Sequence, residues 1–140
     1  MDQNLKREII LDNYQNPKNR GITGRSGYEL VNMNNDSCID EVNVEMKINN
    51  NLIEDIHFDG EACAICTSSS SIMTNVLKGK TIDQANKIID NYYKMINGEE
   101  YNQELLEEAN VYDDIAKQPN RKKCALLAWW GAENLIKREK

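Results

Sequence analysis

The sequence lacks the features of a membrane protein, a secreted protein or a nucleic-acid-binding protein. Its apolar runs are far shorter than a transmembrane helix requires. The first residues, MDQNLKREII, mix acids and bases without an uninterrupted apolar region, unlike a signal peptide. The 17 Lys and Arg residues are outnumbered by 23 Asp and Glu residues, and the net charge of −6 provides no dominant basic surface. We therefore expect a soluble, cytoplasmic protein that binds neither membranes nor nucleic acids.

Length and cysteine content indicate the number of domains and the role of the cysteines. A chain of 140 residues can bury a hydrophobic core without help from disulfides, and we expect a single domain over residues 1–140. The sequence contains four cysteines. Because disulfides are rare in the cytoplasm, these cysteines favour metal binding or catalysis over a disulfide framework.

The hydrophobic pattern predicts a helix first, then strands, then further helices. Residues 4–15 form the first amphipathic pattern, which ends at Asn16 and Pro17 because the residue before a proline disfavours helical geometry. The apolar stripe that we expect this helix to bury contains Leu5, Ile9, Ile10, Leu11 and Tyr14.

Three strands are predicted next, over residues 28–33, 40–48 and 52–58. The second alternates apolar and polar side chains, which is the pattern of a strand with one buried face. Residues 49–51 are all asparagine, which tolerates the left-handed backbone of a tight turn between strands. His57 is the only histidine. It alternates away from the apolar face, so we expect it to be exposed rather than a ligand or a catalytic base.

Helical periodicity returns in the second half of the chain. We predict long helices over residues 64–78, 81–98 and from 119 or 120 to 137. The second of these begins with a capping box formed by Thr81 and Gln84. Between the last two lies an acidic segment, residues 98–119, for which we predict one or two short helices with a solvated, charged face.

The stretch FDGEACAICTSSSSIMT, residues 58–74, joins a predicted strand to a predicted helix. Cys63 lies near the N-terminus of that helix, where unpaired backbone N–H groups and the helix dipole favour the thiolate. The thiolate is the form of cysteine that binds metal and attacks sulfur. Two other interpretations stay open, namely a buried structural cysteine and a redox pair of Cys63 with Cys66.

Three more residues are candidates to join Cys63 in a metal site. Cys38 and Asp40 lie two residues apart at the start of a predicted strand, so both side chains point to the same side. Cys124 lies in the first turn of the last predicted helix. Three thiolates and one carboxylate suit a tetrahedral Zn²⁺, and sulfur ligands also suit an iron–sulfur cluster. The spacings between these residues match no zinc-finger pattern.

Five motifs cover nearly the whole chain in order: LDNYQNPKNRG (11–21), SCIDEV (37–42), FDGEACAICTSSSSIMT (58–74), VLKGKT (76–81) and RKKCALLAWWGAE (121–133). Together they resemble the SufU/IscU family of iron–sulfur cluster assembly proteins, which is related to the N-terminal domain of NifU. The resemblance implies an α+β fold in which a small antiparallel three-stranded sheet packs against several helices. It also implies that the metal ligands are Cys38, Asp40, Cys63 and Cys124.

Several features resemble the SufU branch, whose members are zinc-dependent sulfurtransferases, more than scaffold-type IscU members. Lys123 stands where the scaffold-type members have a histidine before the last ligand, and segment 98–119 adds length. Arg121 matches an arginine of the SufU branch. The alternative interpretation of Arg121 is a surface charge at the start of a helix, and we expect Lys122 to lie on a solvated helix face.

Two positions depart from the family pattern. Ala62 stands where the family usually has glycine, so the backbone there is not expected to need a positive φ. Cys66 occupies a position that is normally not cysteine. We predict that Cys66 is a small buried hydrophobic residue and not a ligand.

The resemblance implies a sulfurtransferase that works as the partner of a desulfurase rather than as a stand-alone enzyme. A SufS-like, PLP-dependent cysteine desulfurase would supply a persulfide, and Cys38, released from zinc, would attack its sulfane sulfur as a thiolate. Arg121 would guide this exchange, and downstream iron–sulfur assembly proteins would use the sulfur. One alternative is a scaffold that assembles a transient [2Fe–2S] cluster on the same ligands. Another is a structural zinc protein, for which a carboxylate ligand is unusual.

Overall fold

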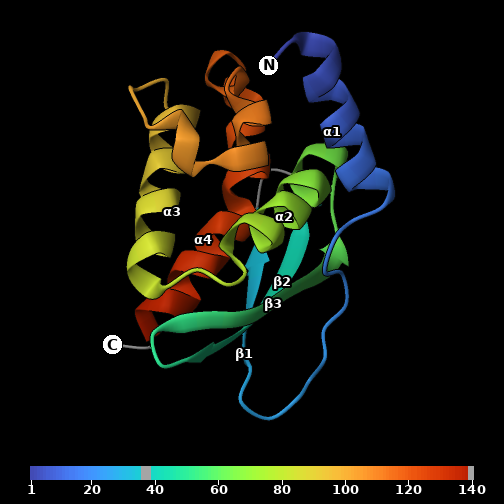
Figure 1. Cartoon of the computed structure of the whole chain (residues 1–140). Helices are drawn as coiled ribbons and strands as arrows, with labels where there is room; N and C mark the ends of the chain where they lie inside the picture. The colour runs from blue at the N-terminus through green and yellow to red at the C-terminus, as the bar shows by residue number, and fades with distance from the viewer. Residues whose placement is uncertain (36–38, 139–140) are drawn as a thin grey trace.

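The computed structural model describes residues 1–35 and 39–138 (Figure 1). Its helices and strands are α1 (Gln3–Gln15), β1 (Glu29–Asn34), β2 (Glu41–Asn49), β3 (Leu52–Glu61), α2 (Ala64–Leu77), α3 (Ile82–Ile96) and α4 (Lys122–Arg138). Short 3₁₀ helices between α3 and α4 are η1 (Gln103–Leu105), η2 (Glu107–Tyr112), η3 (Ile115–Lys117) and η4 (Pro119–Arg121). This order confirms the predicted α+β fold.

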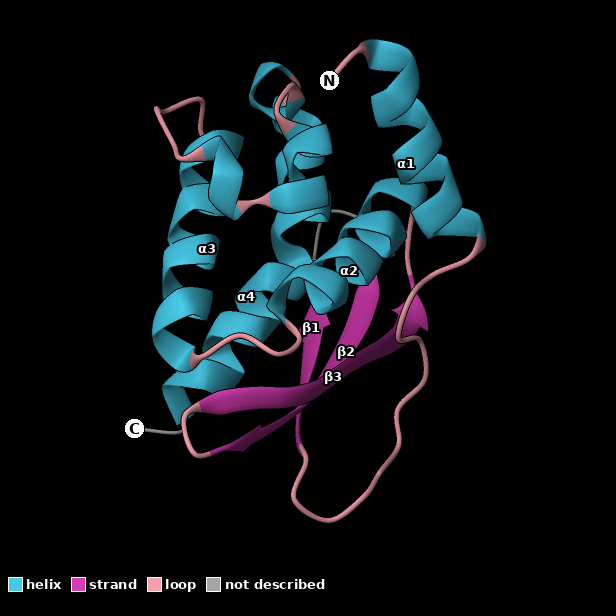
Figure 2. Ribbon diagram, viewed as in Figure 1, coloured by secondary structure: helices cyan, strands magenta, loops and turns pink. Residues whose placement is uncertain are grey.

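The strands form one antiparallel sheet in the order β1–β2–β3, as predicted. Val42, Val44 and Met46 of β2 are each at most 1% exposed, which confirms the predicted alternation of side chains. Asn50 and Asn51 join β2 to β3 with φ angles of 52° and 61°, the left-handed conformation expected for this turn. The helices lie on one face of the sheet (Figure 2), so the buried strand side chains point toward them.

Helices α2 and α4 pack directly on the sheet and on each other. Gly131 allows α4 to approach β1 and β2 closely, because a Cβ at this position would lie 3.0 Å from side-chain carbons of Met33 and Val44. Trp129 of α4 stacks on Tyr92 of α3 with the ring centroids 3.9 Å apart, which joins these two helices. Among the described helices, none combines the length and the apolar character needed to cross a membrane.

The buried face of α1 differs from the predicted apolar stripe. Three residues of that stripe are exposed, namely Leu5 at 44%, Leu11 at 48% and Tyr14 at 45%. Lys6 and Asn13 are buried instead. Ser71 of α2 donates a 2.7 Å hydrogen bond to Asn13 Oδ1, and Lys6 Nζ forms a 2.6 Å ion pair with Asp113. The prediction was right for Ile9 and Ile10, which are partly buried against the core. It was wrong for the other three residues, because α1 also packs against polar partners, which a hydrophobicity pattern cannot identify.

Segment 98–119 contributes to the hydrophobic core as well as carrying charge. It contains three 3₁₀ helices instead of the one or two short helices predicted, and η4 precedes the first residue of α4. The segment lies between α3 and α1 (Figure 1). Its buried side chains are Leu106, Ala109, Val111, Tyr112 and Ile115. The prediction that this segment forms only a solvated, charged face was therefore wrong.

The loop before β1 covers part of the sheet face that points away from the helices. Glu45 of β2 is 2% exposed because this loop lies over it. Its carboxylate accepts hydrogen bonds from the backbone N–H groups of Thr23 at 3.0 Å and Gly24 at 2.9 Å. These bonds satisfy a carboxylate that would be costly to bury alone.

His57 lies on this outer face but is not freely exposed as predicted. Its side chain is 19% exposed, and its Nε2 lies 2.8 Å from Asp55 Oδ2. Tyr28, from the covering loop, donates a 2.6 Å hydrogen bond to the same carboxylate. Partial burial raises the pKa of Asp55, but hydrogen bonds from Tyr28, His57 and Lys78 outweigh this effect and lower the pKa to about 2.

Gly60 allows the end of β3 to lie tightly against the start of β2. Its φ of +145° is in the region that favours glycine, and a Cβ there would lie 2.1 Å from the carbonyl oxygen of Glu41. The positive φ in this approach belongs to Gly60 and not to Ala62, which confirms the prediction for Ala62. The contact brings the residues that follow Gly60 next to Asp40.

Replacing Gly60 with alanine should lower the free energy of unfolding by about 2–4 kcal/mol, because the new methyl group overlaps a backbone oxygen. Gly79→Ala is the matched control, since Gly79 has a φ of +82° but no atom within 4 Å of the new Cβ. The control should cost about 1 kcal/mol from backbone strain alone. Urea titration measures both losses, and equal losses would contradict the close contact.

Replacing Asp55 with asparagine should lower the free energy of unfolding at pH 7 by about 1–2 kcal/mol, with allowance for screening by solvent. The pKa of Asp55 falls from its ordinary value of 3.8 to about 2 on folding. Its stabilising effect is therefore present above about pH 4 and disappears as the pH falls toward about 2. Urea titrations of wild type and Asp55→Asn between about pH 4 and about pH 2 should show that the difference in their free energies of unfolding shrinks as the pH falls. A difference independent of pH would rule out this role.

Candidate metal centre

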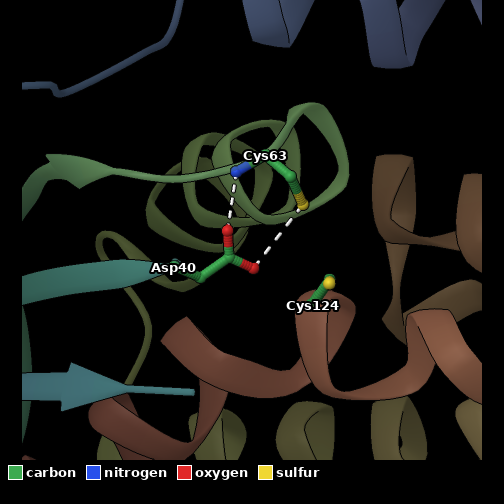
Figure 3. Close-up of side chains that lie close together, drawn as sticks. All are labelled: Asp40, Cys63 and Cys124. Carbon is green, nitrogen blue, oxygen red and sulfur yellow. Dashed lines mark hydrogen bonds between the residues drawn. The ribbon is translucent and has the colours of Figure 1, made fainter. Parts of the chain in front are cut away.

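Three predicted metal ligands come together in the structure (Figure 3). Asp40 directly precedes β2, Cys63 directly precedes α2, and Cys124 lies in the first turn of α4. One donor atom from each lies within 4.8 Å of the others. The fourth predicted ligand, Cys38, lies outside the described residues.

Cys63 occupies the N-cap of α2, as the sequence indicated. Its Sγ accepts a 3.4 Å hydrogen bond from the backbone N–H of Cys66. Its own backbone N–H donates a 2.7 Å hydrogen bond to Asp40 Oδ1. The position of Cys63 is therefore set by the helix on one side and by Asp40 on the other.

Asp40 presents its second carboxylate oxygen to the sulfur atoms. It is 2% exposed, and its Oδ2 lies 3.5 Å from Cys63 Sγ. A buried carboxylate is costly unless it is paired or coordinates a metal, and the Cys63 N–H supplies part of the compensation. Oδ2 is thus directed toward the space that the two cysteines share (Figure 3).

Cys124 is 8% exposed and completes the described group. Burial raises the pKa of its thiol, and the nearby Cys63 and Asp40 raise it further. A divalent cation would reverse this effect, because it binds thiolates and attracts their negative charge. Ligand atoms around a tetrahedral Zn²⁺ lie roughly 3.5–3.8 Å apart, given Zn–S bonds of about 2.3 Å. The described donors fit such a group in chemistry, and Asp40 Oδ2 and Cys63 Sγ already have this spacing at 3.5 Å.

Cys66 is completely buried one helical turn after Cys63. Its thiol is not part of the donor group formed by the described residues. Burial raises the pKa of Cys66, so its thiol is a poor nucleophile. Cys63, Cys66 and Cys124 are all free thiols. The structure thus places Cys66 as a small packed side chain, in agreement with its predicted role.

Arg121 lies at the end of η4 and is exposed, three residues before Cys124. Lys123 is also exposed, in the first turn of α4 and immediately before the same cysteine. Neither side chain forms an ion pair with a described residue. A role of Arg121 in sulfur exchange remains a prediction.

The sequence did not reveal the residues that support the first turn of α2. Thr67 Oγ1 donates a 3.2 Å hydrogen bond to the carbonyl of Ala62, and Ser68 is hydrogen-bonded to Tyr112 of η2. These bonds hold the turn that carries Cys63. The available signal was the run of five hydroxyl residues at 67–71, all of them buried, since buried hydroxyls need partners.

Comparison with known proteins supports a common ancestry for nearly the whole chain. Residues 5–137 match the family described as NifU-like N terminal domain. The chain is 36% identical to the zinc-dependent sulfurtransferase SufU of Bacillus subtilis, over 96% of this chain and 91% of the relative. It is 37% identical to the iron–sulfur cluster assembly scaffold protein IscU of Streptococcus pyogenes, over 93% of this chain and 81% of the relative.

A solved structure of an iron–sulfur cluster assembly protein also matches this fold. A putative iron–sulfur cluster assembly scaffold protein for the SUF system, from Fervidobacterium islandicum, superimposes with a TM-score of 0.79 at 30% identity. The match covers 90% of this chain and 92% of that one. The chain therefore belongs to the NifU-like N-terminal domain family, with the SufU and IscU proteins of iron–sulfur cluster assembly as its relatives.

Proposed function

We propose that this protein is a zinc-dependent sulfur acceptor in iron–sulfur cluster assembly, which takes sulfur onto Cys38 from a SufS-like, PLP-dependent cysteine desulfurase. The observation that carries the proposal is the group of donors from Asp40, Cys63 and Cys124 within 4.8 Å. The similarity to a zinc-dependent sulfurtransferase over 96% of the chain supports the same function. We assign the fourth ligand position to Cys38, two residues before Asp40.

Each residue of the site has a distinct part in this proposal. Asp40, Cys63 and Cys124 would hold the zinc, and Asp40 is kept in place by the Cys63 N–H. Bound zinc would keep the thiols deprotonated and protected from oxidation. Cys38 accepts the sulfur. Arg121, exposed and three residues before Cys124, would attract the anionic persulfide.

The transfer step is a thiol exchange without net oxidation. The Cys38 thiolate attacks the terminal sulfur of the desulfurase persulfide, and a new S–S bond forms on Cys38. The S–S bond of the donor breaks, and the donor cysteine leaves as a thiolate. The product is a persulfide on Cys38, from which downstream assembly proteins would take the sulfur.

A scaffold that assembles a transient [2Fe–2S] cluster is the second candidate function. The 37% identity to a protein named as an IscU scaffold favours it. Lys123 argues against it, because scaffold-type members resembling this chain have a histidine at that position. A structural zinc site without sulfur chemistry is the third candidate, and the Asp40 carboxylate is unusual for such a site.

Metal binding should distinguish the two neighbouring cysteines. The purified protein should contain about one Zn²⁺ per chain, and a chelator should lower its melting temperature because metal binding and folding are coupled. Cys63→Ser should lose the zinc. Cys66→Ser is the matched control and should retain it, since Cys66 is packed away from the donor group. Metal analysis and thermal unfolding measure both effects, and loss of zinc from Cys66→Ser would overturn the assignment.

Sulfur acceptance should depend on Cys38. The wild-type protein should accelerate desulfurase turnover and carry a persulfide detectable by mass spectrometry. Cys38→Ala should abolish both, and the far-UV circular dichroism of the variant should remain unchanged. Stimulation that survives in Cys38→Ala would move the acceptor role to another residue. Stable cluster assembly without desulfurase stimulation would favour the scaffold function instead.

A further inference from the structure

Two buried hydroxyl groups meet at the carbonyl oxygen of Ala125, the residue that follows Cys124. Ser69 of α2 donates a hydrogen bond to this oxygen at 2.8 Å, and Tyr92 of α3 donates one at 2.7 Å. Both side chains are at most 1% exposed. Because a buried hydroxyl is costly without a partner, each donor is tied to this carbonyl. The backbone next to a candidate ligand is thus held from two other helices.

Trp129 of α4 fixes the orientation of both donors. Its Nε1 donates to Ser69 Oγ at 3.1 Å, so the serine accepts from one residue of α4 and donates to another. Its ring stacks on the ring of Tyr92, with the centroids 3.9 Å apart and the planes at 11°. Burial raises the pKa of Tyr92, so its hydroxyl stays protonated and remains a donor. The network is therefore directional.

Neighbouring hydroxyls on the same helices have other partners. Ser70 Oγ donates to the carbonyl of Cys66 at 2.7 Å, within α2 itself. The Tyr93 hydroxyl bonds Glu133 at 3.3 Å, nine residues beyond Cys124 in α4. Ser69 and Tyr92 instead reach the first turn of α4. These neighbours offer matched comparisons for the two donors.

The network connects the helices that carry two of the described ligands. Cys63 is the N-cap of α2, and Cys124 lies in the first turn of α4. Asp40 is joined to Cys63 by the 2.7 Å bond from the Cys63 N–H. Ser69 then joins α2 to the turn of Cys124. Contacts between protein atoms therefore place all three donors within 4.8 Å of one another.

We propose that Ser69 and Tyr92 are positioning residues for the metal centre, which hold Cys124 at the distance from Cys63 that a metal ion requires. They act through the backbone of Ala125. A ligand held in place loses less conformational freedom when metal binds, so the affinity for metal is higher. The inference rests on the metal centre of the proposed function and does not depend on sulfur transfer.

The test compares Ser69→Ala and Tyr92→Phe with the controls Ser70→Ala and Tyr93→Phe. Each control removes one hydroxyl from the same helix, and neither of these hydroxyls bonds the first turn of α4. Zinc affinity is measured by competition with a chromophoric chelator. Absorption spectra after loading with Co²⁺ report the thiolate ligands and the geometry. Urea titration of the metal-free proteins measures the general loss of stability.

We expect Ser69→Ala and Tyr92→Phe to weaken zinc binding roughly five- to tenfold and to change the cobalt spectrum. Both controls should stay within about twofold of wild type in zinc affinity, even where their unfolding free energies fall as far. A merely structural role would lower stability in variant and control alike. Equal zinc affinities and cobalt spectra in each variant and its control would overturn the positioning role.

A second measurement keeps the two hypotheses separate. If wild type binds neither zinc nor cobalt, the metal centre of the proposed function fails, and the metal-free protein decides the positioning role. In a Cys38→Ala background, dibromobimane, which bridges two neighbouring thiols, should join Cys63 to Cys124. Mass spectrometry should show less of this cross-link in Ser69→Ala and Tyr92→Phe than in their controls. Equal yields would contradict positioning by the two hydroxyls.

Discussion

The hydrogen bond from the backbone N–H of Cys63 to the Asp40 carboxylate is the contact on which the candidate metal centre depends. At 2.7 Å it joins the start of β2 to the N-terminus of α2. It uses an N–H group at the helix N-cap and partly offsets the cost of burying a carboxylate. The tight β2–β3 contact at Gly60 makes this bond possible, because it brings the end of β3 alongside Asp40.

The third described ligand is placed by polar contacts inside the core. Ser69 of α2 donates a 2.8 Å hydrogen bond to the carbonyl of Ala125, the residue after Cys124, and Tyr92 donates to the same carbonyl at 2.7 Å. Trp129 Nε1 donates to Ser69 Oγ at 3.1 Å. These directional bonds set the first turn of α4 relative to α2, which apolar packing alone specifies less sharply. The buried hydroxyl run of α2 thus has a direct consequence for the site.

The candidate metal centre gathers ionisable groups of the same sign, whereas several ion pairs elsewhere join groups of opposite sign. Several charged side chains elsewhere are paired in ways that connect elements, such as Lys6 of α1 with Asp113 and Lys80 with Glu107. At the centre, two thiols and a buried carboxylate lie together, and they are mutually unfavourable when ionised without a cation. A group of donors that is locally unfavourable by itself is suited to bind a metal, since the metal removes part of the cost.

The sequence by itself determined those features whose physical cause is local. Alternation in β2, the asparagine turn, the capping box at Thr81 and the N-cap position of Cys63 follow from backbone preferences and nearest-neighbour periodicity, and all are present. Only the tertiary structure decided which polar residues are buried. Asn13 and Lys6 are covered, and His57 is half-covered, because their partners come from α2, from segment 98–119 and from the loop over the sheet. The spacing of Asp40, Cys63 and Cys124 in the sequence likewise did not show that these residues lie close together. It results from three element ends that only the packed sheet and helices bring together.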